Sequence, residues 1–531
     1  CSSDLSYDLL LKNLDISSFD TKKVENMKGM FYYCYSLKDL NVTNFKTDLV
    51  KDMSYMFAYC NSLLELNLSI FNTTNVNTFY YMFAFSEYLL SLDLSSFNSI
   101  NVESMSHMFD NCKRLSSLNI KNFNVKKVLD MSYMFNECSK LTELDLSNFE
   151  TESVIDLSYL FTNNKMLKSL DLSKFNTRKV FDMAHMFEGN EELESINLSS
   201  FDTTNVEDMS YMFKDCKKIK NLDLTNFSTE KLENIDFMFN SCSSLESLII
   251  KNFKTEKIGN MAHLFEKCSS LTSLDLTSFN TEKVTTMSYM FSDSEKLSDL
   301  IIDKLNTKNV NDMSHMFENL KSLKNIVLSS FNTEKVVNFE NMFYNCESLE
   351  SLDLLSFNTN SAVNMAQMFS GCKSLNSLKK SFDVTSVTDM TKMFNGCSNL
   401  KELDLSEFKT DNLLNATFLF YGCNSLKTLK LDKFNTSKLT SMECMFYKCS
   451  SLISLDLSSF ETENVVSISY MFNSCSSLTE LNLSNFNTKD CFRFTSMFTG
   501  TKKIKVTINK DNNPILVENN KDKLDFSDEK I

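Results

Sequence analysis

Hydrophobic and polar positions recur along this chain with a period of 26 residues. One Phe begins the register at Phe19, and a second Phe, first seen at Phe31, follows twelve residues later in every copy. The register is broken only by Leu305, which replaces the first Phe once, and by a one-residue deletion near Lys379. We count nineteen copies. Self-similarity at such a period indicates a stacked repeat array.

The idealised unit reads L-x-x-L-D-L-S-x-F-N-T-x-x-V-x-x-M-S-x-M-F-x-x-C-x-S. Its first part alternates apolar and polar residues, which predicts a short half-buried strand. In its second part, Val284, Met287, Met290 and Phe291 follow a helical spacing, so we expect a short helix. One unit cannot bury its own apolar face. The pattern therefore predicts an α/β repeat solenoid of leucine-rich-repeat type, with a parallel sheet on the concave face and short helices on the convex face.

The repeats also define the expected domain organisation. Residues 1–10 keep partial phase and are interpreted as a degenerate N-terminal cap or a truncated repeat, and residues 11–500 form the solenoid. Apolar and polar residues alternate again within 501–512, which predicts a capping strand. The polar and charged residues 513–531 are expected to be a flexible tail.

The repeat unit resembles that of the BspA-like leucine-rich-repeat surface proteins, which carry runs such as F-N-T-x-x-V-x-x-M-S-x-M-F-x-x-C. The resemblance covers about residues 5–500, where both Phe positions, the Met pair, the Cys and L-x-x-L-D-L recur together. It implies a surface molecule of a bacterium or protist that acts in adhesion or in contact with host or matrix. It does not imply a particular ligand.

Charge and hydropathy narrow the classes of partner. The net charge is −15 and no Lys/Arg-rich run stands out, so nucleic acid is excluded as an expected partner. No apolar stretch is long enough to cross a membrane. The sequence begins at Cys1, which resembles the lipidated start of a mature bacterial lipoprotein and would anchor the solenoid to a membrane. The alternative is that Cys1 is a fragment boundary.

Histidine and cysteine are the natural candidates for chemistry, but both follow the repeat. Every His stands two residues before the second Phe, where other copies have Tyr, so we interpret it as a replacement for an aromatic ring; the four are His107, His185, His263 and His315. Thirteen of the sixteen Cys share one position, three residues after the second Phe. That position is expected to hold small buried thiols, with disulfides between repeats as the alternative. The repeated Met and Phe stripe is expected to be core.

A row of Asp and Asn lies four residues before the first Phe, where the strand should point outward. Fourteen of the nineteen copies have Asp or Asn there. The row is interpreted as a solvated polar face, with a bound cation such as calcium as the alternative. It is interrupted by Ile249, Ile301 and Val327, while Lys430 reverses the charge. An apolar patch on a polar face is a candidate ligand-contact site, and drift of an exposed position is the alternative interpretation.

No catalytic, cofactor-binding or metal-ligating set emerges from the sequence, so we expect no enzyme activity and no cofactor. The preferred hypothesis is a surface-displayed or extracellular repeat protein that binds a protein or glycan. The second hypothesis is an intracellular, cytoplasmic scaffold for protein interactions. Largely reduced thiols would favour the second.

Overall fold

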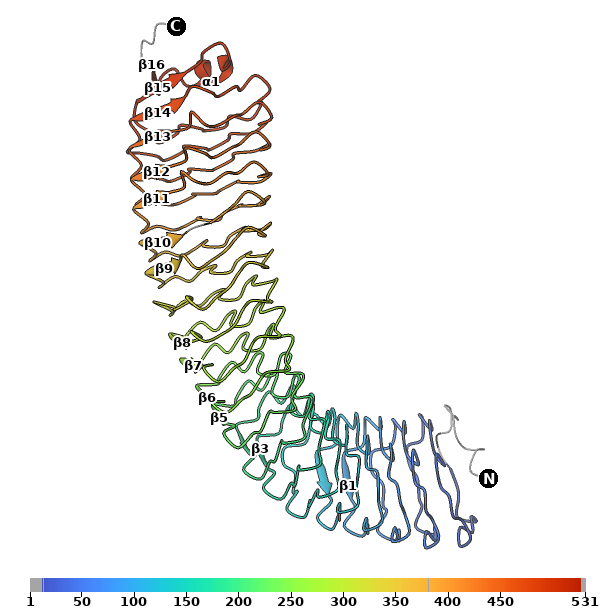
Figure 1. The fold of residues 1–531 in the computed structure, drawn as a ribbon. Helices are drawn as coiled ribbons and strands as arrows, with labels where there is room; N and C mark the ends of the chain where they lie inside the picture. Colours follow the sequence, from blue (N-terminus) through green and yellow to red (C-terminus); the bar gives the residue numbers. More distant parts are fainter. Residues whose placement is uncertain (1–11, 13, 381, 527–531) are drawn as a thin grey trace. The chain divides into compact units, whose positions relative to one another are not determined.

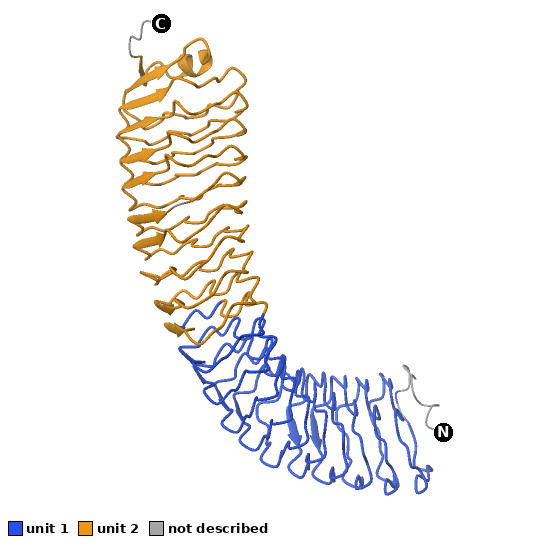
Figure 2. Cartoon of the chain, in the orientation of Figure 1, with its two compact units in different colours: residues 1–258, 267–271 blue, residues 259–266, 272–531 orange. Residues whose placement is uncertain are grey.

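The computed structural model describes residues 12, 14–380 and 382–526, and the chain winds through them as stacked coils (Figure 1). Two compact units can be distinguished (Figure 2). Unit 1 comprises residues 1–258 and 267–271, and unit 2 comprises residues 259–266 and 272–531. The expected cap at 1–10 and the proposed lipid site at Cys1 lie outside the described residues.

Most coils contribute one short strand to a parallel pairing. In unit 1 the strands are β1 (Ser91–Asp93), β2 (Ser117–Asn119), β3 (Ser169–Asp171), β4 (Ser195–Asn197), β5 (Asn221–Asp223) and β6 (Ser247–Ile249). In unit 2 they are β7 (Ser273–Asp275), β8 (Asp299–Ile301), β9 (Ser351–Leu354), β10 (Ser377–Lys380), β11 (Glu402–Asp404), β12 (Thr428–Lys430), β13 (Ser454–Asp456), β14 (Glu480–Leu483), β15 (Ile504–Ile508) and β16 (Leu524–Phe526). Strands β1 to β12 pair two by two in sequence order, and β13 to β16 form one sheet.

The strand part of the prediction is confirmed. Leu92 of β1 is buried between the exposed Ser91 and Asp93, and it is in register with Leu118 of β2. Residues one period apart therefore occupy the same place on consecutive coils, which is the arrangement of a parallel β-solenoid.

The predicted short helices are wrong. Within the described residues, the only helix is α1 (Pro514–Asn519), which lies beyond the repeats. The M-S-x-M-F segment instead forms successive tight turns, in which the N–H of Met56 donates to the carbonyl of Met53, three residues back. Tyr55, between them, has a φ of 58°. A series of such turns points a side chain inward about every third residue, as a helix does, so the apolar spacing does not distinguish the two.

Hydrogen bonds between coils replace those a helix would make within itself. The N–H of Tyr55 donates to the carbonyl of Tyr80 at 2.9 Å, and the N–H of Phe57 donates to that of Met82 at 2.9 Å. The turn segment of one coil is therefore tied to that of the next. Left-handed backbone at a non-glycine residue costs on the order of 1 kcal/mol, and this ladder holds the segment in that conformation.

Stacked side chains fill the inside of the coils. Phe31 and Phe57 are fully buried with ring centroids 5.6 Å apart, and Met53 and Met56 are buried beside them. Thr73 forms a second internal ladder, because its hydroxyl donates to the carbonyl of Asn98 and accepts from the N–H of the same residue. The expected Met and Phe core is confirmed.

The C-terminal segment differs from the expectation of a flexible tail after residue 513. Helix α1 buries Leu516, and strand β16 pairs in parallel with β15. Strand β15 in turn pairs with β14, the last strand of the repeats. The apolar Leu516 and Leu524, both buried, tie this stretch to the end of unit 2. Residues 527–531 of the expected tail lie outside the described residues.

Candidate functional site

The Asp and Asn row at the strand ends has a structural role in every coil that carries it. Each of its fourteen members accepts a hydrogen bond on its side-chain oxygen from the backbone N–H two residues later, at 2.9–3.4 Å. This is the geometry of an Asx turn, in which a short polar side chain stabilises the corner that follows. The row therefore serves the turn after the strand.

The predicted contact patch falls where this turn bond is missing. In unit 1, Ile249 at the end of β6 is 39% exposed, and in unit 2, Ile301 at the end of β8 is likewise 39% exposed. Val327, one coil after Ile301, is 59% exposed. An apolar side chain at this position both gives up the turn cap and exposes apolar area, and neither change favours the folded chain.

The four predicted patch residues are divided between the two units. Ile301 and Val327 occupy equivalent positions of consecutive coils in unit 2, whereas Ile249 belongs to unit 1. Lys430 lies four repeats after Val327, and its ammonium pairs with Asp404 of the neighbouring strand at 2.8 Å. Lys430 thus continues the row as an ion pair, and the apolar patch of unit 2 reduces to Ile301 and Val327.

A second feature lies on the turn segments, where side chains of successive coils stack as a row of rings. In unit 1, the rings of His107, Tyr133, Tyr159 and His185 follow one another at centroid distances of 4.1–4.3 Å. In unit 2, Tyr289 lies 4.8 Å from His263 and 4.1 Å from His315. Each imidazole thus takes the place of a tyrosine ring in the stack.

Every histidine also has an acidic partner three residues later. The Nδ1 atom of His107 lies 2.7 Å from a carboxylate oxygen of Asp110. The equivalent distances are 2.5 Å for His185 and Glu188, 2.6 Å for His263 and Glu266, and 2.5 Å for His315 and Glu318. These side chains are largely shielded from solvent, so each pair is a hydrogen-bonded contact between partly buried groups rather than a loose surface ion pair.

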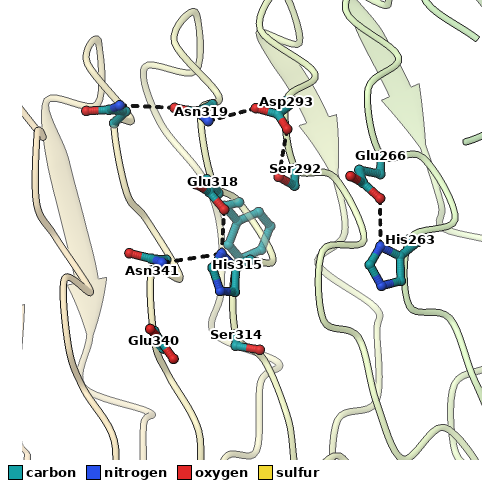
Figure 3. A network of polar contacts seen from close by, with 12 residues as sticks. His263, Glu266, Ser292, Asp293, Ser314, His315, Glu318, Asn319, Glu340 and Asn341 are labelled. Carbon is teal, nitrogen blue, oxygen red and sulfur yellow. Dashed lines mark hydrogen bonds and ion pairs between the residues drawn. The ribbon is translucent and has the colours of Figure 1, made fainter. Parts of the chain in front are cut away.

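Figure 3 shows two of these pairs in unit 2 with the polar side chains around them. The amide nitrogen of Asn341 approaches Nδ1 of His315 at 3.4 Å. On the same face, the amide of Asn319 donates to Asp293 at 2.7 Å, and the amide of Asn345 donates to Asn319 at 3.1 Å. The polar side chains therefore connect consecutive coils along the stack.

The pair of His185 and Glu188 has a third charged neighbour, Lys214. Burial raises the pKa of the Glu188 carboxyl, but hydrogen bonds from His185 and Lys214 outweigh burial, so the pKa is lowered overall. The ammonium of Lys214 lies 2.8 Å from Glu188. This carboxyl is consequently held in its charged form between two donors.

The acidic partners were missed in the sequence, although a signal was present. In each of the four copies with His, the residue three positions later is Asp or Glu, and in none of the fifteen other copies is that residue acidic. A comparison of each His with nearby residues of its own repeat, rather than with the same position of other repeats, would have identified the pairs.

The Cys position has a more specific role than the expected small buried side chain. Cys60 donates through Sγ to the carbonyl of Phe31 at 3.2 Å, and Ser86, which fills the same position, donates to Phe57 at 2.7 Å. Asn190 donates to Phe161 from that position too. The position therefore supplies a donor to a buried carbonyl of the preceding coil. Free thiols fill it in six consecutive coils of unit 2, namely at Cys346, Cys372, Cys397, Cys423, Cys449 and Cys475.

The described residues contain neither a metal-ligating group nor a membrane-spanning helix. Over residues 12, 14–380 and 382–526, no group of three or more His, Cys, Asp or Glu side chains has the geometry to hold a metal ion. Within the same ranges, no helix combines the length and apolar character needed to cross a membrane.

The repeats match a known family model along almost the whole chain. The model is described as Mycoplasma protein of unknown function, DUF285, and it matches residues 6–117, 36–143, 84–169, 141–249, 212–321, 298–408 and 415–522. These successive matches bear out the family resemblance drawn from the 26-residue unit. No curated protein matches the sequence significantly.

Solved structures similar to this chain include bacterial leucine-rich-repeat proteins. A leucine-rich repeat protein of Bacteroides ovatus is 18% identical, with 83% of this chain and 87% of that chain covered and a TM-score of 0.37. A leucine-rich cell surface protein of Faecalibacterium prausnitzii is 18% identical, with 58% and 83% covered and a TM-score of 0.35. A leucine-rich repeat protein of Eubacterium ventriosum is 13% identical, with 66% and 81% covered and a TM-score of 0.33.

Proposed function

The chain belongs to the DUF285 family, and from that premise we propose that it is a non-enzymatic repeat protein, displayed on a cell surface, that binds a protein or glycan. The binding surface is assigned to the strand ends of the coils, with Ile301 and Val327 at its centre in unit 2. Repeat arrays of this kind offer an extended surface on which neighbouring coils present equivalent positions, which suits partner binding better than catalysis.

The observation that carries this proposal is the pair Ile301 and Val327. Fourteen other coils use Asp or Asn at the same position to cap the following turn. These two coils instead expose an aliphatic side chain. Because the folded chain gains nothing from that exchange, a partner that buries both side chains is the better explanation.

The binding test replaces both residues by the Asp that other coils carry. The double variant Ile301→Asp with Val327→Asp should keep or raise the melting temperature, because each Asp can cap its turn. Its binding to a glycan array and to a panel of purified matrix proteins should be lost. Val337→Asp with Val363→Asp, at two positions of similar exposure elsewhere on the coils of unit 2, is the matched control and should leave binding unchanged. Equal binding by the wild-type chain and the Ile301/Val327 variant would refute this site.

Surface display is tested separately by protease treatment of intact source cells. Release of fragments of this chain before lysis supports display. Protection until lysis contradicts it and favours the second candidate, an intracellular scaffold. The free thiols of unit 2 support that second candidate, because a reducing compartment keeps such thiols from oxidation.

A further inference from the structure

A second apolar row lies in unit 1, on a different part of each coil from the strand ends. Leu129, Ile155 and Phe181 occupy equivalent positions of three consecutive coils and are 45%, 39% and 44% exposed. The N–H of Ile155 donates to the carbonyl of Leu129 at 2.9 Å, and the N–H of Phe181 donates to that of Ile155 at 3.0 Å. The three side chains are therefore neighbours on one continuous backbone ladder.

Acidic residues close both ends of this row. The same ladder continues from Leu129 to Glu103 through a hydrogen bond of 2.8 Å, and from Phe181 to Glu207 through another of 2.8 Å. The apolar surface is thus limited to three coils. A partner that covers it reaches a carboxylate at each end.

A row of carboxylates runs alongside the apolar row. Asp130, Asp156, Asp182 and Asp208 each directly follow a member of the ladder and are bridged in register from coil to coil. One oxygen of each caps the N–H two residues later, at 2.7–2.9 Å. Among the described residues, no Lys or Arg forms an ion pair with any of the four. Four charges about 4.8 Å apart therefore repel one another without a cation of the chain between them.

The titration of the two central carboxyls agrees with this arrangement. Burial raises the pKa of Asp182, and the charges of Asp156 and Asp208 raise it further, while the hydrogen bond from the N–H of Ala184 and the charge of His185 lower it without cancelling the increase. Burial likewise raises the pKa of Asp156, with Asp130 adding to it. Lys127 and Lys179 stand two residues before Leu129 and Phe181 in the sequence, and the ammonium of Lys127 is bonded to Asn101. The carboxylates thus retain capacity for an external cation.

We propose that Leu129, Ile155 and Phe181, together with the adjacent Asp row, form a docking surface for a basic amphipathic helix of a partner protein. Charge complementarity selects a basic partner, because Lys or Arg beside its apolar face would meet the Asp row and both terminal Glu residues. Spacing selects a helix, because two helical turns advance about 11 Å and two coil steps about 10 Å. Successive apolar residues of the helix can then each meet one side chain of the row.

The equivalent positions of unit 2 provide an internal comparison. Val337 and Val363 are 42% and 41% exposed on consecutive coils, but the residues that follow them are Asn338 and Asn364. Apolar side chains at this position therefore occur without the acidic row. The combination of both is what assigns a basic partner to unit 1. This inference adds to the proposed function a partner chemistry on a different face, so the strand-end patch and this surface can each fail alone.

The test uses the purified full chain and a labelled helical peptide of about 15 residues built from Leu and Lys, with all Leu on one face. Fluorescence anisotropy should show binding that weakens as salt is raised. Asp156→Asn with Asp182→Asn removes two charges and keeps both turn caps, since Asn occupies this position at Asn234 and Asn338. We expect that variant to bind about tenfold more weakly. Ile155→Ser with Phe181→Ser should weaken binding to a similar degree, and Val337→Ser with Val363→Ser should not.

Three results would overturn the proposal. The first is unchanged binding by the Asp156/Asp182 variant with a melting temperature no lower than that of the wild type. The second is equal binding of a peptide of the same composition whose Leu are scattered around the helix. The third is a dimer of the full chain, seen by sedimentation velocity, that Phe181→Ser dissociates, because the occupant would then be a second copy of this chain. Failure of the strand-end test with success of this one would remove only the first binding site.

Discussion

The side-chain carbonyl of Asn345 occupies the space beside Gly371 in which any other residue would place its Cβ. A Cβ built on Gly371 would lie 2.1 Å from Oδ1 of Asn345, and Gly371 has a φ of +78°. Asn345 is itself the end of the amide row that runs through Asn319 to Asp293. Gly371 therefore terminates a chain of side-chain hydrogen bonds between coils of unit 2.

Gly371→Ala should consequently destabilise unit 2 more than the equivalent change in the next coil. Gly396 has a similar φ of +72°, but its Cβ would meet nothing closer than 3.7 Å. Gly396→Ala should cost about 1 kcal/mol for left-handed backbone. Gly371→Ala should cost about 1–2 kcal/mol more, because Asn345 must move. Chemical denaturation of both variants checks this, and adding Asn345→Ala should remove the difference; equal losses would show that Asn345 can move without cost.

The Cys position yields a prediction about hydrogen bonding rather than size. Cys372 donates to the buried carbonyl of Phe343 at 3.1 Å, and burial raises the pKa of its thiol to about 12. Cys372→Ser should change the free energy of unfolding little, since Ser294 makes the same bond in its coil. Cys372→Val keeps the size but removes the donor, and should cost about 1–3 kcal/mol. Equal stability of the Ser and Val variants, measured by denaturant titration, would mean that the thiol only fills space.

The 26-residue periodicity correctly predicted the features that depend on which side chains point inward. Strands such as β1 and the Phe31 and Met53 core follow from apolar spacing alone. The helix prediction was wrong, because apolar residues at about every third position are compatible with both a helix and a series of turns. What decides between them is the left-handed backbone at residues such as Tyr55 and His107, and an aromatic side chain at those positions gives no warning of it.

The candidate sites, like the fold, could be predicted from the sequence only in part. Ile301 and Val327 were visible as breaks in an outward-facing row, because a two-residue strand period fixes which side chains face out. The role of the row itself was not visible, since an Asx bond depends on the corner that follows the strand. The acidic row of unit 1 could not be predicted for a related reason. Asp130 and Asp156 lie in the segment that was predicted to be a short helix, and helices of neighbouring repeats would not bridge residues one period apart as this backbone ladder does.

The His and acidic residues of one coil should behave as a coupled pair. His315→Tyr alone replaces the ring by the Tyr of other coils but leaves the largely shielded Glu318 without its donor, which should cost about 1–3 kcal/mol. His315→Tyr with Glu318→Ser reproduces the combination Tyr289 and Ser292 of the preceding coil and should recover most of that loss. A double-mutant cycle on the free energy of unfolding measures the coupling. Additive losses would show that the pair is not linked.

The Asp row of unit 1 should affect the pH dependence of folding stability in the direction opposite to that of the strand-end row. The pKa of Asp182 is raised above the usual 3.8, so the folded state binds its proton more tightly than the unfolded chain does. Asp182→Asn should therefore stabilise unit 1 at pH 7, by a few tenths to about 1 kcal/mol. The advantage should shrink as the pH falls through the raised pKa, because the wild-type carboxyl then becomes neutral as well.

Asp93→Asn is the matched control for that change. Hydrogen bonds from Ser95 lower the pKa of Asp93. The charged carboxylate therefore stabilises the folded state above the pKa of the unfolded chain, and this stabilisation is lost as the pH falls through the lowered pKa of the folded state. Removing that charge should slightly destabilise unit 1 at pH 7, although Asn can still cap the turn, and the deficit should vanish in acid. Melting temperatures of both variants and the wild type between pH 3 and pH 8 compare the two rows directly. If both substitutions shift stability in the same direction at pH 7, repulsion within the Asp130 to Asp208 row is not what sets the stability of these coils.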